Sequence, residues 1–215
     1  MLDFAAARQN MVDGQVRTAD VTDLRILSAM LEIPRERFVP RDAADLAYLD
    51  FDLPVGGNRR LIKPMVFAKL VQAADIDPED HVLDIACASG YGAAVLARVA
   101  GSVVALEQDK KLAAAAAETL AGLPNVTTAT GLLAAGWVQS APYDAIVLEG
   151  ATEVVPHDLC RQLKDGGRLV CVLGSGPAAK AMCYRRSGDD FGGRPLFDTA
   201  APLLPGFAKP AIFAF

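Results

Sequence analysis

The residues with the clearest capacity for chemistry lie where two short apolar segments end. The first segment runs into a loop containing Ser89 and Gly90, and the second ends in Glu107, seventeen residues after Gly90. In open parallel sheets, such junctions gather at the carboxyl edge, where ligands bind. A carboxylate there can accept hydrogen bonds from both hydroxyls of a ribose. Glu107 alone is also compatible with a solvated strand end, but the joint spacing favours a nucleoside site.

The loop itself discriminates between nucleoside ligands. A dinucleotide needs a glycine-rich turn that brings its pyrophosphate onto backbone N–H groups at the start of a helix. The pattern GxGxxG is absent, and Ala86 and Ala88 stand where close approach requires glycine. The loop is better suited to a ligand without a pyrophosphate, such as S-adenosylmethionine.

Alternating apolar segments from residue 76 predict the elements that position these residues. The sequence predicts a doubly wound, mostly parallel seven-stranded α/β sheet of the Rossmann-like kind. Expected strands span residues 82–87, 102–107, 125–129, 144–148 and 168–173, with an antiparallel pair at 181–186 and 211–215. Expected helices span residues 90–99, 110–121 and 156–163.

The N-terminal third has a helical pattern instead. Apolar residues at three- and four-residue steps predict helices over 4–12 and 23–31, the second capped by Thr22. Pro64 is favoured in a first helical turn and opens a helix that runs to about residue 74. We therefore expect a helical cap and active-site lid over residues 1–75 and a Rossmann-like domain over 76–215, forming one compact unit.

Composition limits the function classes. The net charge of −5 argues against a general nucleic-acid binder, which needs a concentrated basic face. No apolar run is long enough to cross a bilayer, and the N-terminus lacks a basic segment followed by an apolar run. The four cysteines are widely spaced, without a CxxC pair or a nearby histidine. We expect a cytoplasmic protein with reduced thiols, no metal site and no membrane association.

Motifs along nearly the whole chain resemble those of protein-L-isoaspartate O-methyltransferases. Residues 29–40 read AMLEIPRERFVP, similar to the family pattern A-M-x-x-V-P-R-E-x-F-V-P. Further matching segments follow in the family's order: AYLD at 47–50, LPVG at 53–56, VLDI at 82–85, SGY at 89–91, APYDAI at 141–146 and QLKDGGRL at 162–169. The set is specific, because methyltransferases in general share only the loop and the acid.

The resemblance implies methyl transfer from S-adenosylmethionine to the side-chain carboxylate of an isoaspartyl residue in a damaged protein. A carboxylate is already ionised at neutral pH, so this reaction needs no general base. It needs an in-line approach and a dry pocket with a few hydrogen-bond donors. Isoaspartyl proteins or peptides are the expected partners.

The resemblance also assigns the contacts within the site. Glu107, with Gln108 beside it, is expected to hold the ribose, and residues 59–63 are expected to cover the site. Leu132 is expected to face the adenine. The residues expected to line the methionine end are Asp84, Ala86, Ala88, Ser89 and Gly90.

Three positions depart from the family pattern. The family segment Q-T-I-S-x-P reads RRLIKP over residues 59–64, so Ile62 replaces the serine whose hydroxyl faces the substrate. Losing one such donor costs on the order of 2.7–4 kcal/mol of transition-state stabilisation. Ala86 and Ala88 replace loop glycines, and a left-handed backbone there costs roughly 1–2 kcal/mol. Leu132 and Leu133 replace an Asp-Gly pair at the adenine end.

Two hypotheses follow from these departures. In the first, the chain is a carboxyl O-methyltransferase with a divergent site, in which Arg60 or Lys63 replaces the lost hydroxyl as the anion holder. In the second, the fold persists as a non-methylating binding or regulatory protein. The cluster of Arg59, Arg60 and Lys63 is also compatible with a solvated loop face.

Overall fold

The computed structural model describes residues 2–210. Its helices are α1 Phe4–Met11, α2 Leu24–Glu32, α3 Pro64–Ala74, α4 Tyr91–Leu96, α5 Lys110–Leu120 and α6 His157–Cys160. Its strands are β1 Leu53–Gly56, β2 Arg59–Leu61, β3 His81–Ile85, β4 Ser102–Glu107, β5 Val126–Thr130, β6 Tyr143–Thr152, β7 Leu163–Leu173, β8 Lys180–Ser187 and β9 Asp190–Asp198. No helix of these residues is both long enough and apolar enough to span a membrane.

The main sheet confirms the predicted fold class. Its seven strands follow the order β5-β4-β3-β6-β7-β8-β9, and the first five of these are parallel to one another. β8 and β9 continue the sheet in antiparallel fashion. The chain leaves β3 towards β4 on one side and returns to β6 on the other. The carboxyl ends of β3, β4 and β6 therefore border the crevice where this class of sheet binds ligands.

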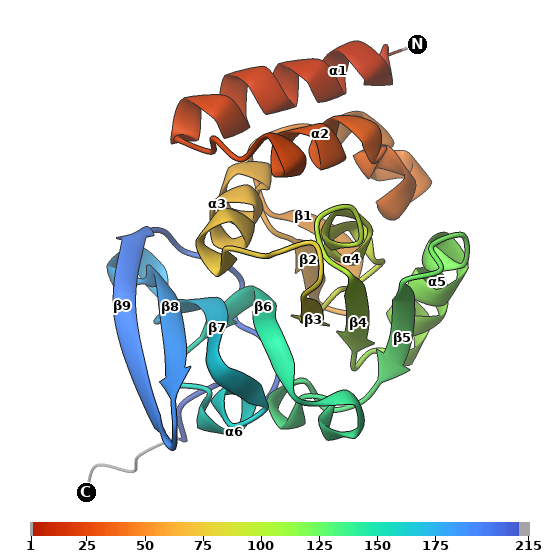
Figure 1. Ribbon diagram of the computed structural model, residues 1–215. Coiled ribbons are helices and arrows are strands. Elements are labelled where there is room, and N and C mark those ends of the chain that lie inside the picture. Colours follow the sequence, from red (N-terminus) through yellow and green to blue (C-terminus); the bar gives the residue numbers. More distant parts are fainter. Residues whose placement is uncertain (1, 211–215) are drawn as a thin grey trace, which may run out of the picture.

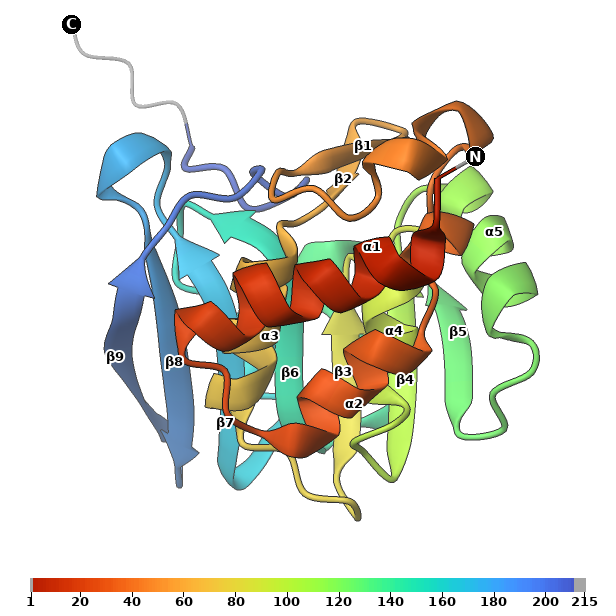
Figure 2. The same cartoon turned by 90° about the horizontal axis from the view of Figure 1, so that it is seen from above.

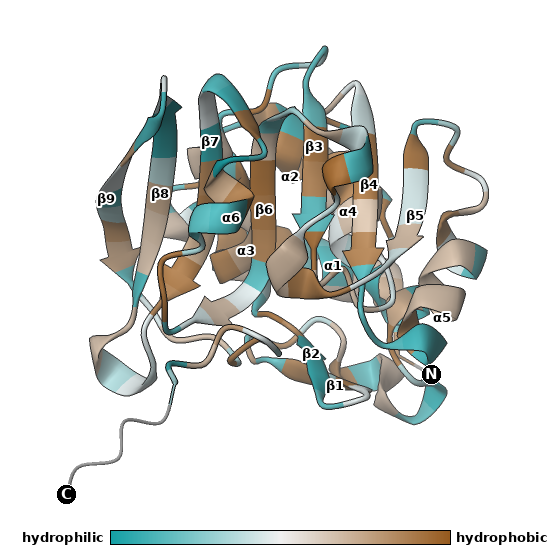
Figure 3. Ribbon diagram, turned by 90° about the horizontal axis from the view of Figure 1, so that it is seen from below, coloured by the Kyte–Doolittle hydropathy of each residue, from teal (hydrophilic) through white to brown (hydrophobic). Residues whose placement is uncertain are grey.

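The central strands are apolar on both faces because helices cover both sides of the sheet. Val103 and Ala105 of β4 belong to the hydrophobic cluster under α3 and α4, whereas Val104 and Leu106 belong to the cluster on the α6 face. Side chains of a strand alternate between faces, so one strand contributes to both cores. Figure 3 shows β6 and much of β4 as hydrophobic, whereas parts of β8 and β9 are hydrophilic.

The N-terminal helices form an outer layer (Figure 1). α1 and α2 lie over α3 and α4, which pack on the sheet, and residues of all four helices share one buried cluster. A π-helical stretch, Val12–Val16, continues α1. The expected cap at Thr22 is wrong: Asp23 occupies that position and its carboxylate accepts a hydrogen bond from the N–H of Arg25. Aspartate caps at least as well as threonine.

Between the cap and α3, the chain forms a small antiparallel hairpin, β1–β2, where the sequence analysis predicts only a lid. Gly56, Gly57 and Asn58 all have positive φ angles and form its turn. The hairpin lies across the end of the main sheet (Figure 2). It thus covers the edge at which β3 and β4 finish.

Several other boundaries differ from expectation. The helices expected over 90–99 and 156–163 are shorter, at Tyr91–Leu96 and His157–Cys160, and β7 begins earlier, at Leu163. The partner of β8 is β9, not the segment 211–215, which lies outside the described residues. A two-residue turn with a left-handed Gly188 returns the chain directly into β9. The predicted spans 64–74 and 102–107 agree with α3 and β4.

The end of β6 is held by a strap formed by residues 202–207. The N–H of Ala151 donates to the carbonyl of Pro202 at 2.8 Å, and the N–H of Leu204 donates back to Ala151 at 2.9 Å. Leu204 packs against Gly150, and a residue with a side chain would clash there because its Cβ would lie 2.5 Å from Leu204. The strap therefore holds this part of β6 from the side opposite β7, beyond the point where the pairing of β6 with β3 ends.

Candidate functional site

The loop after β3 keeps a conformation that suits glycine, although two of its residues are alanines. Ala86 and Ala88 have φ angles of 70° and 50°, and Gly90 has 97°. The N–H of Ala86 donates to the carbonyl of Leu106 at 2.9 Å, and the N–H of Gly90 donates to Cys87 at 2.7 Å. Each alanine adds strain of roughly 1–2 kcal/mol. The loop therefore carries backbone strain at both alanines.

Glu107 ends β4 and connects three segments through its buried carboxylate. Oε1 accepts hydrogen bonds from the N–H groups of Gln108 at 2.8 Å and Asp109 at 3.0 Å. Oε2 accepts from the N–H of Ala88 at 2.9 Å and from Nε of Arg59 at 3.3 Å. A carboxylate offers about four lone-pair positions, so these donors use its whole acceptor capacity.

Arg59 is the second half of a buried ion pair. The side chains of Arg59 and Glu107 are only 3% and 1% exposed. Strand alternation in β2 turns Arg59 and Leu61 inward and Arg60 outward. The second branch of the guanidinium, Nη2, donates to the carbonyl of Ala86 at 2.6 Å. Arg59 therefore spans both sides of the junction between β3 and β4.

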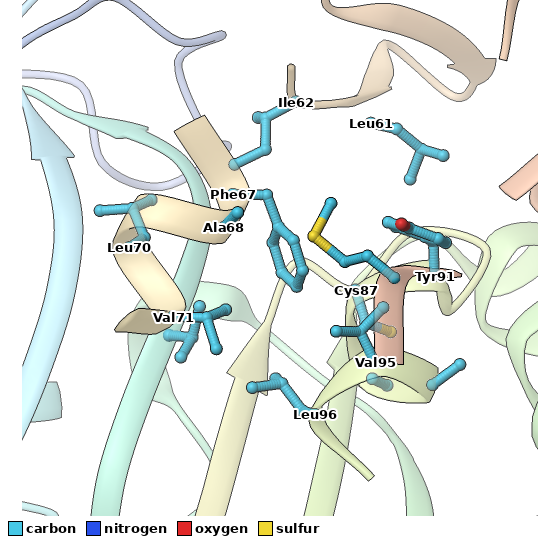
Figure 4. Close-up of a cluster of buried hydrophobic side chains, with 14 of the residues drawn as sticks. Leu61, Ile62, Phe67, Ala68, Leu70, Val71, Cys87, Tyr91, Val95 and Leu96 are labelled. Atoms are coloured by element: carbon cyan, nitrogen blue, oxygen red, sulfur yellow. The ribbon is translucent and has the colours of Figure 1, made fainter. Parts of the chain in front are cut away.

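The remainder of the loop is enclosed by side chains. Ala86, Cys87 and Ala88 have no exposed surface, and Ile62 is 1% exposed. Figure 4 shows Leu61 and Ile62 among the buried side chains that gather around Phe67, Cys87 and Tyr91. Ile62 thus brings a hydrocarbon surface to the position that carries a hydroxyl in the family pattern.

Ser89 and Gly90 are tied to the helices that flank the loop. The Ser89 hydroxyl donates to the carbonyl of Phe38, and the Ser89 carbonyl accepts a hydrogen bond from Thr119 Oγ1 at 2.8 Å. A side chain at Gly90 would meet Leu120, 2.9 Å from its Cβ. These contacts hold the start of α4 between the cap and α5.

A second acid, Glu149, faces Asp84 inside the crevice. A register shift between Val147 and Ala151 interrupts the pairing of β6 with β7, and Glu149 lies in this bulge. Bulges redirect side chains, and this one places the Glu149 carboxylate against Gly92, 2.0 Å from where a Cβ would lie. Among residues 2–210, no N–H or hydroxyl group outside this pair donates to either oxygen of Asp84 or to Oε1 of Glu149.

Burial and mutual repulsion shift the protonation of these two carboxyl groups. Burial raises the pKa of Asp84 to about 7, with a further rise from the charge of Glu107, while the hydrogen bond with Glu149 and the charge of Arg59 act in the opposite direction. Burial and the neighbouring Asp84 raise the pKa of Glu149 well above its usual value. Two like charges in contact cannot both remain ionised at low cost, so the pair holds a shared proton near neutral pH.

Arg35 fixes the segment that follows the hairpin. It is buried, and it donates to the carbonyls of Ala47 at 2.9 Å and Ile62 at 2.8 Å. Its guanidinium lies 4.5 Å from the centre of the Tyr91 ring, a cation–π contact. Arg35 therefore connects the cap, the hairpin and the start of α4.

Other residues expected in the site lie at its rim. Arg60 is exposed and donates to the carbonyl of Asp52 at 3.0 Å, and the N–H of Lys63 donates to the Asp52 carboxylate at 3.0 Å. Leu132 is 66% exposed. The Gln108 side chain accepts a hydrogen bond from the N–H of Leu133 at 3.3 Å.

The sequence interpretation leaves out Arg35 and Glu149 and places Arg59 in an open lid. A glutamate between Leu148 and Gly150, inside an otherwise apolar strand, is the signal that identifies Glu149. Inward orientation of Arg59 follows from strand alternation once β2 is known. Within the described residues, no group of three or more His, Cys, Asp or Glu side chains is arranged to hold a metal ion.

Glu107 offers no free acceptor position to the ribose of an adenosyl group in this conformation. The ribose hydroxyls need free acceptor positions on the carboxylate, and these already receive four donors. The buried Arg59 guanidinium occupies the adjoining space. A hollow of about 330 Å³ lies just outside the pair, lined by Arg59 and Glu107 together with Gly57, Lys110 and Pro205 among others.

Solved structures share this architecture. The chain superposes on a protein-L-isoaspartate O-methyltransferase with a TM-score of 0.80 and 26% identity, covering 93% of this chain and 66% of that one. A Plasmodium falciparum protein described as a putative enzyme of the same kind, solved with S-adenosyl-L-homocysteine, gives 0.77 at 15% identity over 95% and 99% of the two chains. The sheet order and the strand-end site define the class: a Rossmann-like methyltransferase fold.

Sequence comparisons give the family. The chain belongs to the protein-L-isoaspartate(D-aspartate) O-methyltransferase family, whose model matches residues 6–194. It is 40% identical to protein-L-isoaspartate O-methyltransferase 1 of Rhodopseudomonas palustris strain HaA2, over 94% of this chain and 84% of the relative. It is 38% identical to the protein-L-isoaspartate O-methyltransferase of Roseiflexus castenholzii, over 96% of both chains.

The Asp84–Glu149 pair predicts how stability depends on pH. Because the folded-state pKa values are raised, the folded protein binds more protons than the unfolded chain between about pH 4 and pH 7, so stability falls as pH rises through this range. Glu149→Gln removes one acid and supplies an amide donor to Asp84. In urea unfolding, we expect this variant to exceed the wild type by about 1–3 kcal/mol at pH 8 and by less at pH 5.

Glu118→Gln, on the exposed face of α5, is the matched control and should leave the pH profile unchanged. A difference between Glu149→Gln and the wild type that is the same at both pH values would contradict the shared-proton interpretation.

Proposed function

We propose that this chain is an S-adenosylmethionine-dependent carboxyl O-methyltransferase that acts on isoaspartyl residues of damaged proteins. The observation that carries the proposal is the family match over residues 6–194. Two structural features support it: Glu107 at the end of β4 and a loop at Ala86–Gly90 that keeps its left-handed backbone. When bound, the cofactor supplies an electrophilic methyl group.

The chain's own residues have a limited task in this reaction. The substrate carboxylate is ionised at neutral pH, so the protein has to orient it and exclude water. We propose that Glu107 and Gln108 serve the ribose side and that Asp84, Ala86, Ala88, Ser89 and Gly90 serve the methionine side. Leu132 is proposed for the adenine rim.

For the substrate side, we propose Arg60 and Lys63. Both lie within two residues of Ile62, and Arg60 extends from the outward face of β2, where a protein substrate can reach it. A guanidinium binds a carboxylate through charge-assisted hydrogen bonds. This position suits recognition of an isoaspartyl side chain at the surface of another protein.

The direct test is an assay for methyl transfer. Purified protein is incubated with S-adenosylmethionine labelled in its methyl group and with an isoaspartyl peptide, and base-labile label in the peptide is measured. We expect label in the isoaspartyl peptide and none in the matched aspartyl peptide. Absence of label from both peptides, at saturating cofactor, would reject the activity.

Arg60→Ala tests the role proposed for the outward guanidinium. We expect the KM for the isoaspartyl peptide to rise about tenfold, since a hydrogen bond to a charged group contributes about 1.5–3 kcal/mol. The KM for the cofactor should not change. An unaltered peptide KM would remove Arg60 from substrate recognition.

A second candidate function is a binding or regulatory protein without methyl transfer. The observation that favours it is Ile62, whose buried aliphatic side chain cannot donate a hydrogen bond at the position of the family serine. Under this alternative, the isoaspartyl peptide binds and remains unmodified.

Ile62→Ser distinguishes the two candidates. If the chain is an enzyme with a weakened site, restoring the hydroxyl should raise kcat by about tenfold or more with little change in peptide KM, because the donor acts mainly in the transition state. Ile62→Ala is the control, since it removes the same bulk without adding a donor. Equal rates for the two variants would show that the hydroxyl has no catalytic effect here.

We also propose that the chain works in the cytoplasm on protein substrates and does not bind nucleic acid. All four cysteines are free and buried, as is common in reducing compartments. The net charge of −5 disfavours binding to a phosphate backbone. Cell fractionation and a gel-shift assay with DNA and RNA test the two statements.

A further inference from the structure

The ribose acceptor of this fold already has a partner from the same chain. Three of the four donors to Glu107 are backbone N–H groups, and the fourth is the side chain of Arg59. The backbone donors belong to the loop after β3 and to the turn after β4, both of which are fixed by the sheet. Only the arginine side chain can leave without unfolding the edge of the sheet.

Arg59 lies on the β1–β2 hairpin, so the contacts that hold this hairpin determine how easily the guanidinium can leave Glu107. The tip of the hairpin packs on the start of α5, because a Cβ at Gly57 would lie 2.5 Å from the Asp109 carboxylate. Arg59 adds the ion pair with Glu107 and the hydrogen bond to the carbonyl of Ala86. The hollow of about 330 Å³ beside Pro205 lies next to the guanidinium and gives it space to move into.

We propose that Arg59 is a built-in occupant of the ribose subsite, so that an adenosyl ligand binds only after the guanidinium has left Glu107. This rests on the proposed function for the identity of the ligand. The backbone donors keep three acceptor positions of Glu107, so a ribose hydroxyl can bind only at the position on Oε2 that Arg59 uses. Binding of the ribose and the ion pair are therefore mutually exclusive. The apparent affinity for the cofactor is lowered by the fraction of molecules in which Arg59 is displaced.

Arg59→Gln tests the proposal directly. Glutamine removes the charge that competes for Glu107 and, because it is shorter than arginine, also gives up the hydrogen bond from Nη2 to the carbonyl of Ala86. We expect isothermal titration to show that the variant binds S-adenosylhomocysteine about tenfold or more tightly than the wild type. Arg41→Gln, which removes an exposed arginine from the cap, is the matched control and should bind as the wild type does.

A pair of nucleosides identifies the subsite. The gain of Arg59→Gln should be large for adenosine and small for 2′,3′-dideoxyadenosine, because only adenosine has hydroxyls for the released carboxylate. Equal affinity of wild type and variant, whether both bind or neither does, overturns the proposal. Tight binding by Arg59→Gln without methylation of the isoaspartyl peptide supports the proposal while rejecting the enzymatic function.

A measurement on the wild-type protein covers the case in which the variant does not fold. Hydrogen exchange of residues 53–61 is followed with and without saturating S-adenosylhomocysteine. We expect faster exchange with ligand, since release of Arg59 loosens the hairpin. Slower or unchanged exchange overturns the proposal.

Discussion

The buried carboxylate of Glu107 is the interaction on which this edge of the molecule depends. One side chain joins the loop after β3, the turn that leads into α5 and the hairpin that covers the crevice. A buried charge requires this degree of compensation, because an unpaired carboxylate in an apolar surrounding costs several kcal/mol. The hydrogen bonds that stabilise the Glu107 carboxylate also occupy the oxygen positions that a ligand would need as acceptors. The hydrogen bonds within the chain and the hydroxyls of a ligand therefore compete for the same carboxylate.

The fold was predictable from the sequence because its signals are local and repeated. Two-sided apolar strands, Pro64 at the start of α3 and the spacing from Gly90 to Glu107 all follow from short-range rules. Strand β9 was not predictable in this way. Its glycines and charged residues are typical of a loop, and it forms a strand because it pairs with β8.

Within the site, the sequence predicted which segments meet but not which side chains fill the space between them. Arg59 was assigned to a lid because the family pattern places the segment 59–64 over the site, and the pattern does not say which of its side chains point inward. Its inward orientation is set by the pairing of β2 with β1, a tertiary property. Glu149 points inward because of a bulge that no short-range pattern encodes. The conformation of the loop, in contrast, was predictable. The left-handed backbone considered for Ala86 and Ala88 is the one that the structure shows.

The strap of residues 202–207 has a consequence for how a large partner can approach. Its hydrogen bonds to Ala151 and Glu153 use the backbone groups that β6 would otherwise present at this end of the sheet. A polypeptide therefore cannot join the sheet here as an added strand. At this position on β6, contact with another protein therefore goes through side chains, which suits a partner defined by one altered residue instead of by an extended sequence.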